Sequence, residues 1–272
     1  MSNLLLRTIS GIVFVTLFLG SIWWNEYSMF AISTLVLVLG LFEFKRMFKL
    51  KDPYLFALFI AAGVTTMILS YLFFSGQTGF TTLFLLAAGY LVVFTLYYLF
   101  FRGTTILETG RFLFNFFWIT TALVLFMALG WINNPSAYQP SYMIILLSMI
   151  WVYDAGAYLF GSWIGRHMLA PVLSPGKTIE GFVSGILLNS ITGTIAFVVT
   201  GEYSALTWIA ISVAVSLACT AGDLFESKMK REAGVKDSGK VIPGHGGILD
   251  RFDSLYFSTP VFFIIIQILQ SP

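Results

Sequence analysis

Charged residues, cysteine and histidine are all scarce in this sequence. Only 10% of its 272 residues are charged, whereas soluble domains carry about 25%. This scarcity excludes an ordinary soluble globular protein. The single cysteine, Cys219, can form no internal disulfide. The two histidines, His167 and His245, are too few and too far apart in the sequence to suggest a zinc site, so we expect no histidine-based metal centre.

Apolar residues dominate instead: 58% of the chain is hydrophobic, and its mean hydropathy is +0.88. A helix needs about 20 mostly apolar residues to cross the hydrocarbon core of a membrane. We therefore predict an all-α polytopic membrane protein. About nine transmembrane helices are expected, at residues 8–24, 28–43, 54–74, 80–101, 112–131, 142–163, 182–200, 204–221 and 254–270.

The lysines and arginines predict the orientation of these helices. In membrane proteins, Lys and Arg gather in cytoplasmic loops. With the N-terminus inside, all 15 fall on the cytoplasmic side, which predicts an N-in, C-out topology. They are Arg7, Lys45, Arg46, Lys49, Lys51, Arg102, Arg111, Arg166, Lys177, Lys228, Lys230, Arg231, Lys236, Lys240 and Arg251.

The two halves of the chain differ in character. Residues 1–135 carry no ionisable residue well inside a predicted helix, so we interpret them as packing helices that could also form a homodimer. We interpret the basic cluster at residues 45–51 as a topology signal rather than a lipid site. Residues 136–272 form the predicted catalytic transmembrane domain. Asp154 lies there roughly 14 Å inside a predicted helix, and intramembrane acids are functional by default.

A cytoplasmic loop before the seventh predicted helix contains a second candidate site. Pro and Gly residues exclude a helix through it. Ser174 to Thr178 combine a hydroxyl, free backbone amides and a lysine, although the pattern lacks the spacing of a P-loop. Alone, it is equally consistent with a turn and with a phosphate contact. Glu180 stands three residues after Lys177 and is expected to hold that lysine in place.

The stretch 222–254 concentrates the chemistry, with six of the 15 Lys and Arg and six of the 13 Asp and Glu. If the eighth helix continues, Asp223, Glu226 and Lys230 share one of its faces. Asp250 and Asp253 are similarly paired at the start of the ninth helix. Grouped hard oxygen ligands favour Mg²⁺. Acids, basic groups and glycine amides together are what phosphoryl or nucleotidyl transfer requires, so we expect the active site here, at the cytoplasmic ends of the C-terminal helices.

The same stretch closely resembles the signature of the phosphatidate cytidylyltransferase (CDP-diacylglycerol synthase) family. The residues that carry the resemblance are Ser227-x-Met229-Lys230-Arg231-x4-Lys236-Asp237-x-Gly239 and Pro243-x-His245-Gly246-Gly247-Ile248-x-Asp250-Arg251-Phe252-Asp253. The Ser174-Pro-Gly-Lys177-Thr178-x-Glu180-Gly181 block and the Asp154-x3-Tyr158-x2-Gly161 segment also look like family features. The likeness covers about the last 130 residues.

The resemblance implies an enzyme that joins CTP to phosphatidate, giving CDP-diacylglycerol and pyrophosphate for phospholipid biosynthesis. It implies Mg²⁺ and leaves a second cation open. The implied catalytic residues are Asp223, Lys230, Arg231, Asp250, Arg251 and Asp253. The implied substrate-binding residues are Ser174, Lys177, Thr178, Ser227, Lys236, Asp237, His245, Gly246 and Gly247. The implied metal ligands are Asp223, Asp250, Asp253 and Asp154.

The implied location is a bacterial inner membrane, with the active site facing the cytoplasm and no nucleic-acid partner. Two alternatives remain. A CTP-dependent polyprenol kinase would use a similar loop but release CDP. An ion-coupled transporter could also carry an intramembrane acid, although it usually shows internal repeats, and this sequence has none.

Overall fold

The computed structural model describes residues 3–100, 105–239, 241, 244 and 246–271. Within this part of the chain it contains nine α-helices and one two-stranded hairpin. The chain divides into two compact units. The first comprises residues 1–140 together with 237–250, and the second comprises 141–236 together with 251–272.

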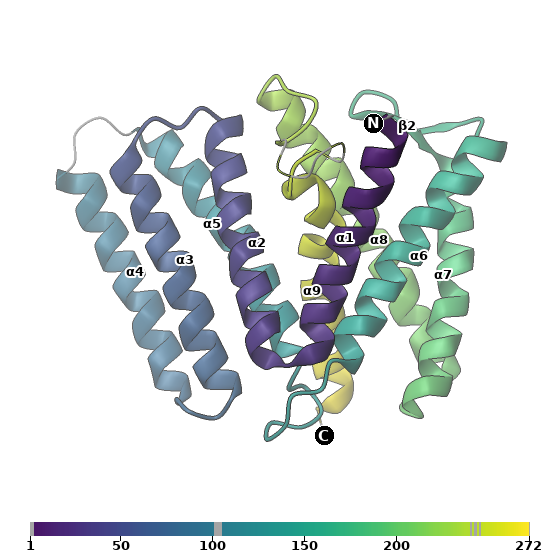
Figure 1. Cartoon of the computed structure of the whole chain (residues 1–272), viewed down its shortest axis with the longest axis horizontal. Coiled ribbons are helices and arrows are strands. Elements are labelled where there is room, and N and C mark those ends of the chain that lie inside the picture. The colour runs from purple at the N-terminus through teal and green to yellow at the C-terminus, as the bar shows by residue number, and fades with distance from the viewer. Residues whose placement is uncertain (1–2, 101–104, 240, 242–243, 245, 272) are drawn as a thin grey trace. The chain divides into compact units, whose positions relative to one another are not determined.

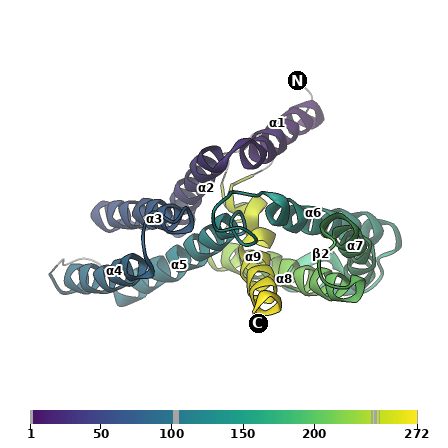
Figure 2. The same ribbon diagram turned by 90° about the horizontal axis from the view of Figure 1, so that it is seen from below.

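The first unit contains five long helices, joined by short connections. They are α1 (Asn3–Trp24), α2 (Glu26–Met47), α3 (Pro53–Phe74), α4 (Phe80–Phe100) and α5 (Ile106–Ala128). Asn25 caps α2 by accepting from the backbone N–H of Ser28, and Asp52 caps α3 just before Pro53. Phe59 of α3 stacks on Phe112 of α5, with ring centroids 5.1 Å apart. Figures 1 and 2 both show α3, α4 and α5 side by side.

The second unit begins with a helix and a hairpin and continues with three helices. Its elements are α6 (Ser141–Ile164), β1 (Met168–Ala170), β2 (Ser174–Thr178), α7 (Ile179–Thr200), α8 (Ala205–Glu232) and α9 (Leu249–Gln270), whose first two residues belong to the first unit. β1 and β2 are antiparallel. Helix α7 packs against both α6 and α8, and Figure 1 shows it beside α6.

Glycines allow α6 and α7 to approach closely. A Cβ atom on Gly181 of α7 would lie 2.5 Å from the carbonyl oxygen of Ala157 and 2.8 Å from the Cα atom of Gly161, both in α6. Real Cβ atoms do not come so near to backbone atoms, so this contact requires glycine. The backbones of α6 and α7 are therefore in direct contact near Gly161.

The predicted all-α polytopic membrane protein is confirmed. Eight of the described helices are long and apolar enough to cross a membrane, and Ile9–Trp24 is a shorter apolar helix. Helix α8 continues past the predicted end at residue 221 to Glu232. Its 28 residues span about 42 Å, more than the roughly 30 Å of a hydrocarbon core. Helix α9 continues through Pro260. The hairpin was not predicted, because Pro and Gly indicated only the absence of a helix. The N-in orientation stays a prediction.

Candidate active site

A cavity of about 250 Å³ that contains charged side chains lies in the second unit. Its lining comes from α6, α7, α8 and the hairpin. Asp154 of α6, Lys177 of β2 and Asp223 of α8 all line it. Three residues that were singled out in separate parts of the sequence are thus brought to one place.

Lys177 forms an ion pair with Asp223. Its ammonium group donates to the Asp223 carboxylate across 46 positions of sequence. Burial lowers the pKa of Lys177, while the negative charges of Asp253 and Asp154 act in the opposite direction. The next residue, Thr178, accepts from the N–H of Gly181 at 3.1 Å and caps α7. The hairpin therefore ends in a helix cap that fixes Lys177 against α8.

Ser254 links the two acids of the cavity. Its hydroxyl lies 3.3 Å from a carboxylate oxygen of Asp154 and 3.3 Å from one of Asp223. The contact depends on close packing of α8 and α9, because a Cβ on Gly222 would lie 2.5 Å from the carbonyl oxygen of Asp253. One hydroxyl carries one proton, so it can donate to only one of the two carboxylates at a time. The remaining negative charge favours a cation at this position.

The acid expected to hold Lys177 has another role. Glu180 accepts from the backbone N–H groups of Arg166 and His167, at 3.0 and 3.2 Å, and contacts the His167 ring at 2.6 Å. The predicted pairing of Glu180 with Lys177 is therefore wrong. The Glu180 carboxylate lies in the first turn of α7 and anchors the loop that follows α6. The free backbone N–H groups of that loop, and not Lys177, donate to it.

The predicted face at the end of α8 carries an internal ion pair. Lys230 donates to Glu226 at 2.6 Å, four residues earlier on the helix, and Glu226 is buried. Arg231 is exposed in the last turn of α8, beyond the apolar part of the helix. Positive charge at a helix C-terminus is favourable, and this placement leaves Arg231 accessible to an anionic ligand.

The acid and hydroxyl oxygens around Ser254 fit a hard divalent cation by their chemistry. Among the described residues, no three His, Cys, Asp or Glu side chains form a ready metal cluster. What the cavity provides is two carboxylates, Asp154 and Asp223, joined by one hydroxyl. Asp253, in the same unit, adds a further negative charge that repels that of Asp154. This donor set fits Mg²⁺, and the metal stays a prediction.

The glycine-rich part of the 222–254 stretch belongs to the first unit and is held by Asp250. One oxygen of Asp250 accepts from the N–H and hydroxyl of Ser238, both at 3.0 Å, and from the N–H of Gly247 at 2.9 Å. The carboxylate at the start of α9 thus closes the loop that precedes it. Its predicted role as a metal ligand stays a prediction.

Glu43 supports the same loop and was not predicted. This buried carboxylate near the end of α2 accepts from the backbone N–H groups of Ile248 and Leu249, at 2.8 and 2.9 Å, and from the Ser238 hydroxyl at 3.1 Å. Because the two N–H groups stand at the start of α9, Glu43 caps that helix from another part of the chain. The only signal in the sequence for Glu43 was a lone carboxylate at the end of an apolar segment. Ser254 was likewise not predicted, although it follows the predicted site residue Asp253.

The predicted site residues divide between the two units. Asp154, Ser174, Lys177, Thr178, Asp223, Ser227, Lys230, Arg231, Lys236, Arg251 and Asp253 belong to the second unit. Asp237, Gly246, Gly247 and Asp250 belong to the first unit. His245, Lys240, Pro243 and Arg102 lie outside the described residues.

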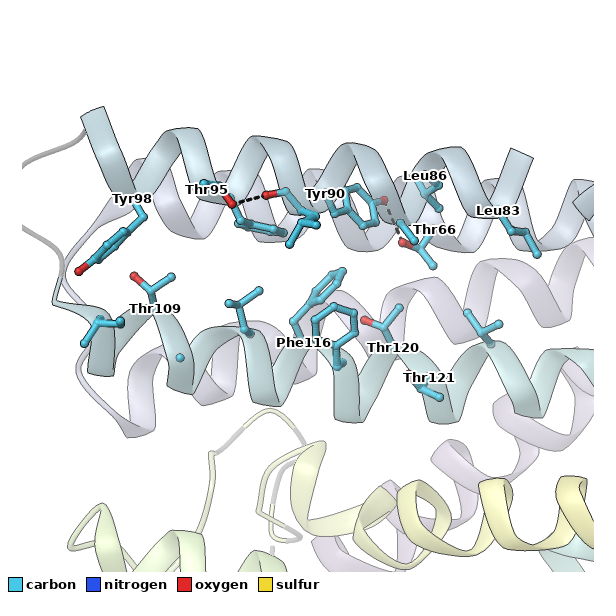
Figure 3. Close-up of a pocket in the computed structure, with 18 of the residues that line it drawn as sticks. Thr66, Leu83, Leu86, Tyr90, Thr95, Tyr98, Thr109, Phe116, Thr120 and Thr121 are labelled. Carbon is cyan, nitrogen blue, oxygen red and sulfur yellow. Dashed lines mark hydrogen bonds between the residues drawn. The ribbon is translucent and has the colours of Figure 1, made fainter. Parts of the chain in front are cut away.

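A second cavity, of about 670 Å³, lies between α4 and α5 in the first unit. Figure 3 shows Tyr90 and Tyr98 of α4 facing Phe116 and Thr109 of α5 across it. The Tyr90 hydroxyl and the Thr66 hydroxyl of α3 lie 2.9 Å apart at its edge. In the described part of the chain, no charged side chain lines this space. It therefore lacks the groups that phosphate chemistry requires.

Comparison with known proteins identifies the family. A model of the cytidylyltransferase family matches residues 5–269. A Staphylococcus aureus (strain COL) protein named phosphatidate cytidylyltransferase is 46% identical over 127 residues, which are 46% of this chain and 48% of the relative. A Staphylococcus haemolyticus (strain JCSC1435) protein of the same name is 43% identical over 127 residues, with the same coverage. The alignments span about half the length of these curated relatives. The family model covers nearly the whole chain, and the chain therefore belongs to the cytidylyltransferase family.

Proposed function

We propose that this protein is a phosphatidate cytidylyltransferase. A phosphate oxygen of phosphatidate attacks the α-phosphorus of CTP, the bond between the α-phosphorus and its bridging oxygen breaks, and pyrophosphate leaves. The product is CDP-diacylglycerol. The observation that carries the proposal is the cavity lined by Lys177, Asp223 and Asp154, beside membrane-length helices, with the Ser254 hydroxyl 3.3 Å from both acids. Family membership and the names of the relatives support it.

This reaction does not require a strong general acid or base from the protein. The phosphate nucleophile is already ionised at neutral pH, so positioning and charge neutralisation can provide most of the rate. Lys177 supplies a positive charge held by its ion pair, and Arg231 an exposed one, for phosphate oxygens. Asp154, Asp223 and Ser254 would hold Mg²⁺. When bound, Mg²⁺ would neutralise negative charge on phosphate oxygens.

The membrane location fits a substrate with two acyl chains and a charged headgroup. Lys177 and Asp223 come from the hairpin and from the polar end of α8, whereas the helices they border are apolar. We propose that this end of the helices faces the cytoplasm, as the distribution of Lys and Arg predicts, since CTP would then reach the cavity from the cytosol.

The test is an assay of the purified protein in detergent with phosphatidate, Mg²⁺ and labelled CTP. We expect equal amounts of CDP-diacylglycerol and pyrophosphate, and loss of both after chelation of Mg²⁺. Ser254→Ala should lower kcat by at least about tenfold, since it removes the hydroxyl that joins the two acids. Ser190→Ala is the matched control, because the Ser190 hydroxyl donates within its own helix. Release of CDP would instead identify a lipid kinase, and no product with several phosphatidates would refute the proposal.

A further inference from the structure

A third cavity, of about 610 Å³, lies at the end of α2 in the first unit. Three cations line it: Lys45 and Arg46 in the last turn of the helix and Lys49 just beyond. Phe42 of the same helix and Gly239, from the loop held by Glu43, also form part of its wall. The cavity therefore combines a basic helix end with a loop fixed by hydrogen bonds.

None of these cations forms a close ion pair within the described residues, although Asp52 interacts with Lys45 at longer range. No Asp or Glu oxygen there lies within 4.0 Å of the charged groups of Lys45, Arg46 or Lys49. Glu43 also lines the cavity, but its two oxygens already accept from Ile248, Leu249 and Ser238. The Glu43 carboxylate, the acid closest in sequence, is thus hydrogen-bonded to the loop. With three cations and one acid in its lining, the cavity carries a net positive charge.

The three cations are not equivalent. The Lys45 ammonium lies 4.3 Å from the centre of the Phe56 ring, a cation–π contact that fixes it. Arg46 and Lys49 are exposed. Lys49 has a φ of 52°, in the left-handed region where helix ends normally place glycine. A lysine at this position carries a conformational cost, and such outliers point to a function for the side chain.

The position of the cavity indicates the kind of anion. Helix α2 is long and apolar enough to span a membrane, so its last turn lies at the level of lipid headgroups. Phe42, with 51% of its surface exposed, stands one turn before Arg46 on the side of the hydrocarbon. Cations at headgroup level above an exposed apolar ring match a lipid phosphate better than a nucleotide phosphate.

We propose that this cavity binds the phosphate headgroup of phosphatidate, with Arg46 and Lys49 as its main ligands. The identity of the lipid rests on the proposed function. A guanidinium fork and an ammonium group are suited to a phosphate monoester, which offers three oxygens and close to two negative charges. A site in α2 would extend the binding of substrate beyond the signature residues at the C-terminal end of the chain.

Lys51 provides a control within the same basic cluster. It is exposed and does not line the cavity. If the cluster acts only as a topology signal or as diffuse attraction for anionic lipid, Lys51 should count as much as Arg46 or Lys49. If the cavity is a binding site, only the residues that line it should matter.

The kinetic test uses full-length protein in mixed micelles, which removes any effect of membrane orientation. We expect the double variant Arg46→Gln/Lys49→Gln to raise the KM for phosphatidate at least tenfold, with kcat and the KM for CTP within twofold of wild type. Lys51→Gln should resemble wild type, and Arg46→Lys/Lys49→Arg should retain most of the affinity. An equal effect of Lys51→Gln would overturn the proposal. A rise in the KM for CTP alone would overturn the assignment to a lipid.

A binding test separates this proposal from the proposed function. The probe is a fluorescent short-chain phosphatidate in detergent, with the matching diacylglycerol as the uncharged control. Wild type should bind the phosphatidate probe, and the double variant should lose at least tenfold in affinity while keeping the wild-type unfolding temperature. That result supports the site even if no CDP-diacylglycerol is formed. Equal binding by both proteins, or displacement of the probe by CTP but not by unlabelled phosphatidate, would overturn it.

Discussion

The carboxylate of Glu43 accepts a hydrogen bond from the backbone N–H of Leu249, which stands 206 positions later in the chain. It accepts a second from Ile248, 205 positions later. A side chain near the end of the second helix therefore caps the ninth helix and holds the glycine-rich loop before it. A residue of α2 therefore holds in place part of the stretch that carries the family resemblance.

Glu43→Ala should weaken this loop more than any single change within it. It leaves two N–H groups and one hydroxyl without their acceptor, and hydrogen bonds to a charged group contribute about 1.5–3 kcal/mol each. We expect kcat/KM for cytidylyl transfer to fall at least about tenfold and amide exchange at residues 246–250 to accelerate. Glu26→Ala, at the opposite end of α2, is the control and should leave exchange in the loop unchanged. Wild-type exchange in Glu43→Ala would contradict the role assigned to Glu43.

Gly247→Ala should damage the same loop from the other side. A Cβ atom there would collide with the Ser238 hydroxyl and the Glu43 carboxylate. These two groups are held in place by the hydrogen bond between them. Overpacking of this kind costs about 1–3 kcal/mol. We expect a lower unfolding temperature in detergent and reduced activity. Gly89→Ala in α4 meets no atom within 4 Å and should behave as wild type. A Gly247→Ala protein as stable and active as the control would refute the tight packing.

The Lys177–Asp223 pair allows stability to be separated from chemistry. Lys177→Met or Asp223→Asn alone leaves one charge without its partner. We expect each to lower stability by about 1–3 kcal/mol, below the range for fully buried pairs because both side chains retain contact with solvent. The double variant removes both charges and should recover part of the stability. It should stay inactive, since the positive charge for phosphate is gone. Thermal unfolding and product release, measured on the same samples, test both statements, and recovered activity in the double variant would exclude a catalytic role.

Gly181→Ala should separate α6 from α7. Its Cβ would lie 2.5 Å from the carbonyl oxygen of Ala157, and a backbone atom within a helix cannot easily move. We expect an unfolding temperature several degrees below wild type and a loss of activity, because both Asp154 and the hairpin depend on this packing. Gly20→Ala in α1, with no atom within 4 Å, should have little effect. An unchanged unfolding temperature would show that the two helices are less tightly packed than described.

Local patterns in the sequence predicted the helices and part of the site. Apolar runs located the nine described helices because crossing a hydrocarbon core requires length and hydropathy, both of which are properties of a single segment. The eighth helix was predicted to end at residue 221, whereas α8 continues to Glu232, so the face shared by Asp223, Glu226 and Lys230, which depended on such a continuation, is present. The isolation of Asp154 in an apolar helix marked it as a site residue, and the structure places it within reach of the Ser254 hydroxyl.

Contacts between distant segments could not be predicted in this way. Glu180 was assigned to Lys177 because the two are close in sequence, whereas the backbone N–H groups of Arg166 and His167, in the loop after α6, donate to it instead. The partners of Glu43 are backbone atoms, which leave no trace in residue types. Ser254 gains its importance from two helices that pack against its own, and no single segment carries that information.

The pairing of Glu43 with Leu249 also sets an order for assembly. Residues 237–250 complete the first unit, yet the ribosome reaches them about 200 residues after α2. At the usual 5–20 residues per second, this interval is roughly 10–40 s. During this interval, the residues that donate hydrogen bonds to the Glu43 carboxylate have not yet been synthesised. The N-terminal unit thus becomes complete only when α9 begins to be synthesised, so that a stalled or shortened chain leaves this unit without the segment that pairs with Glu43.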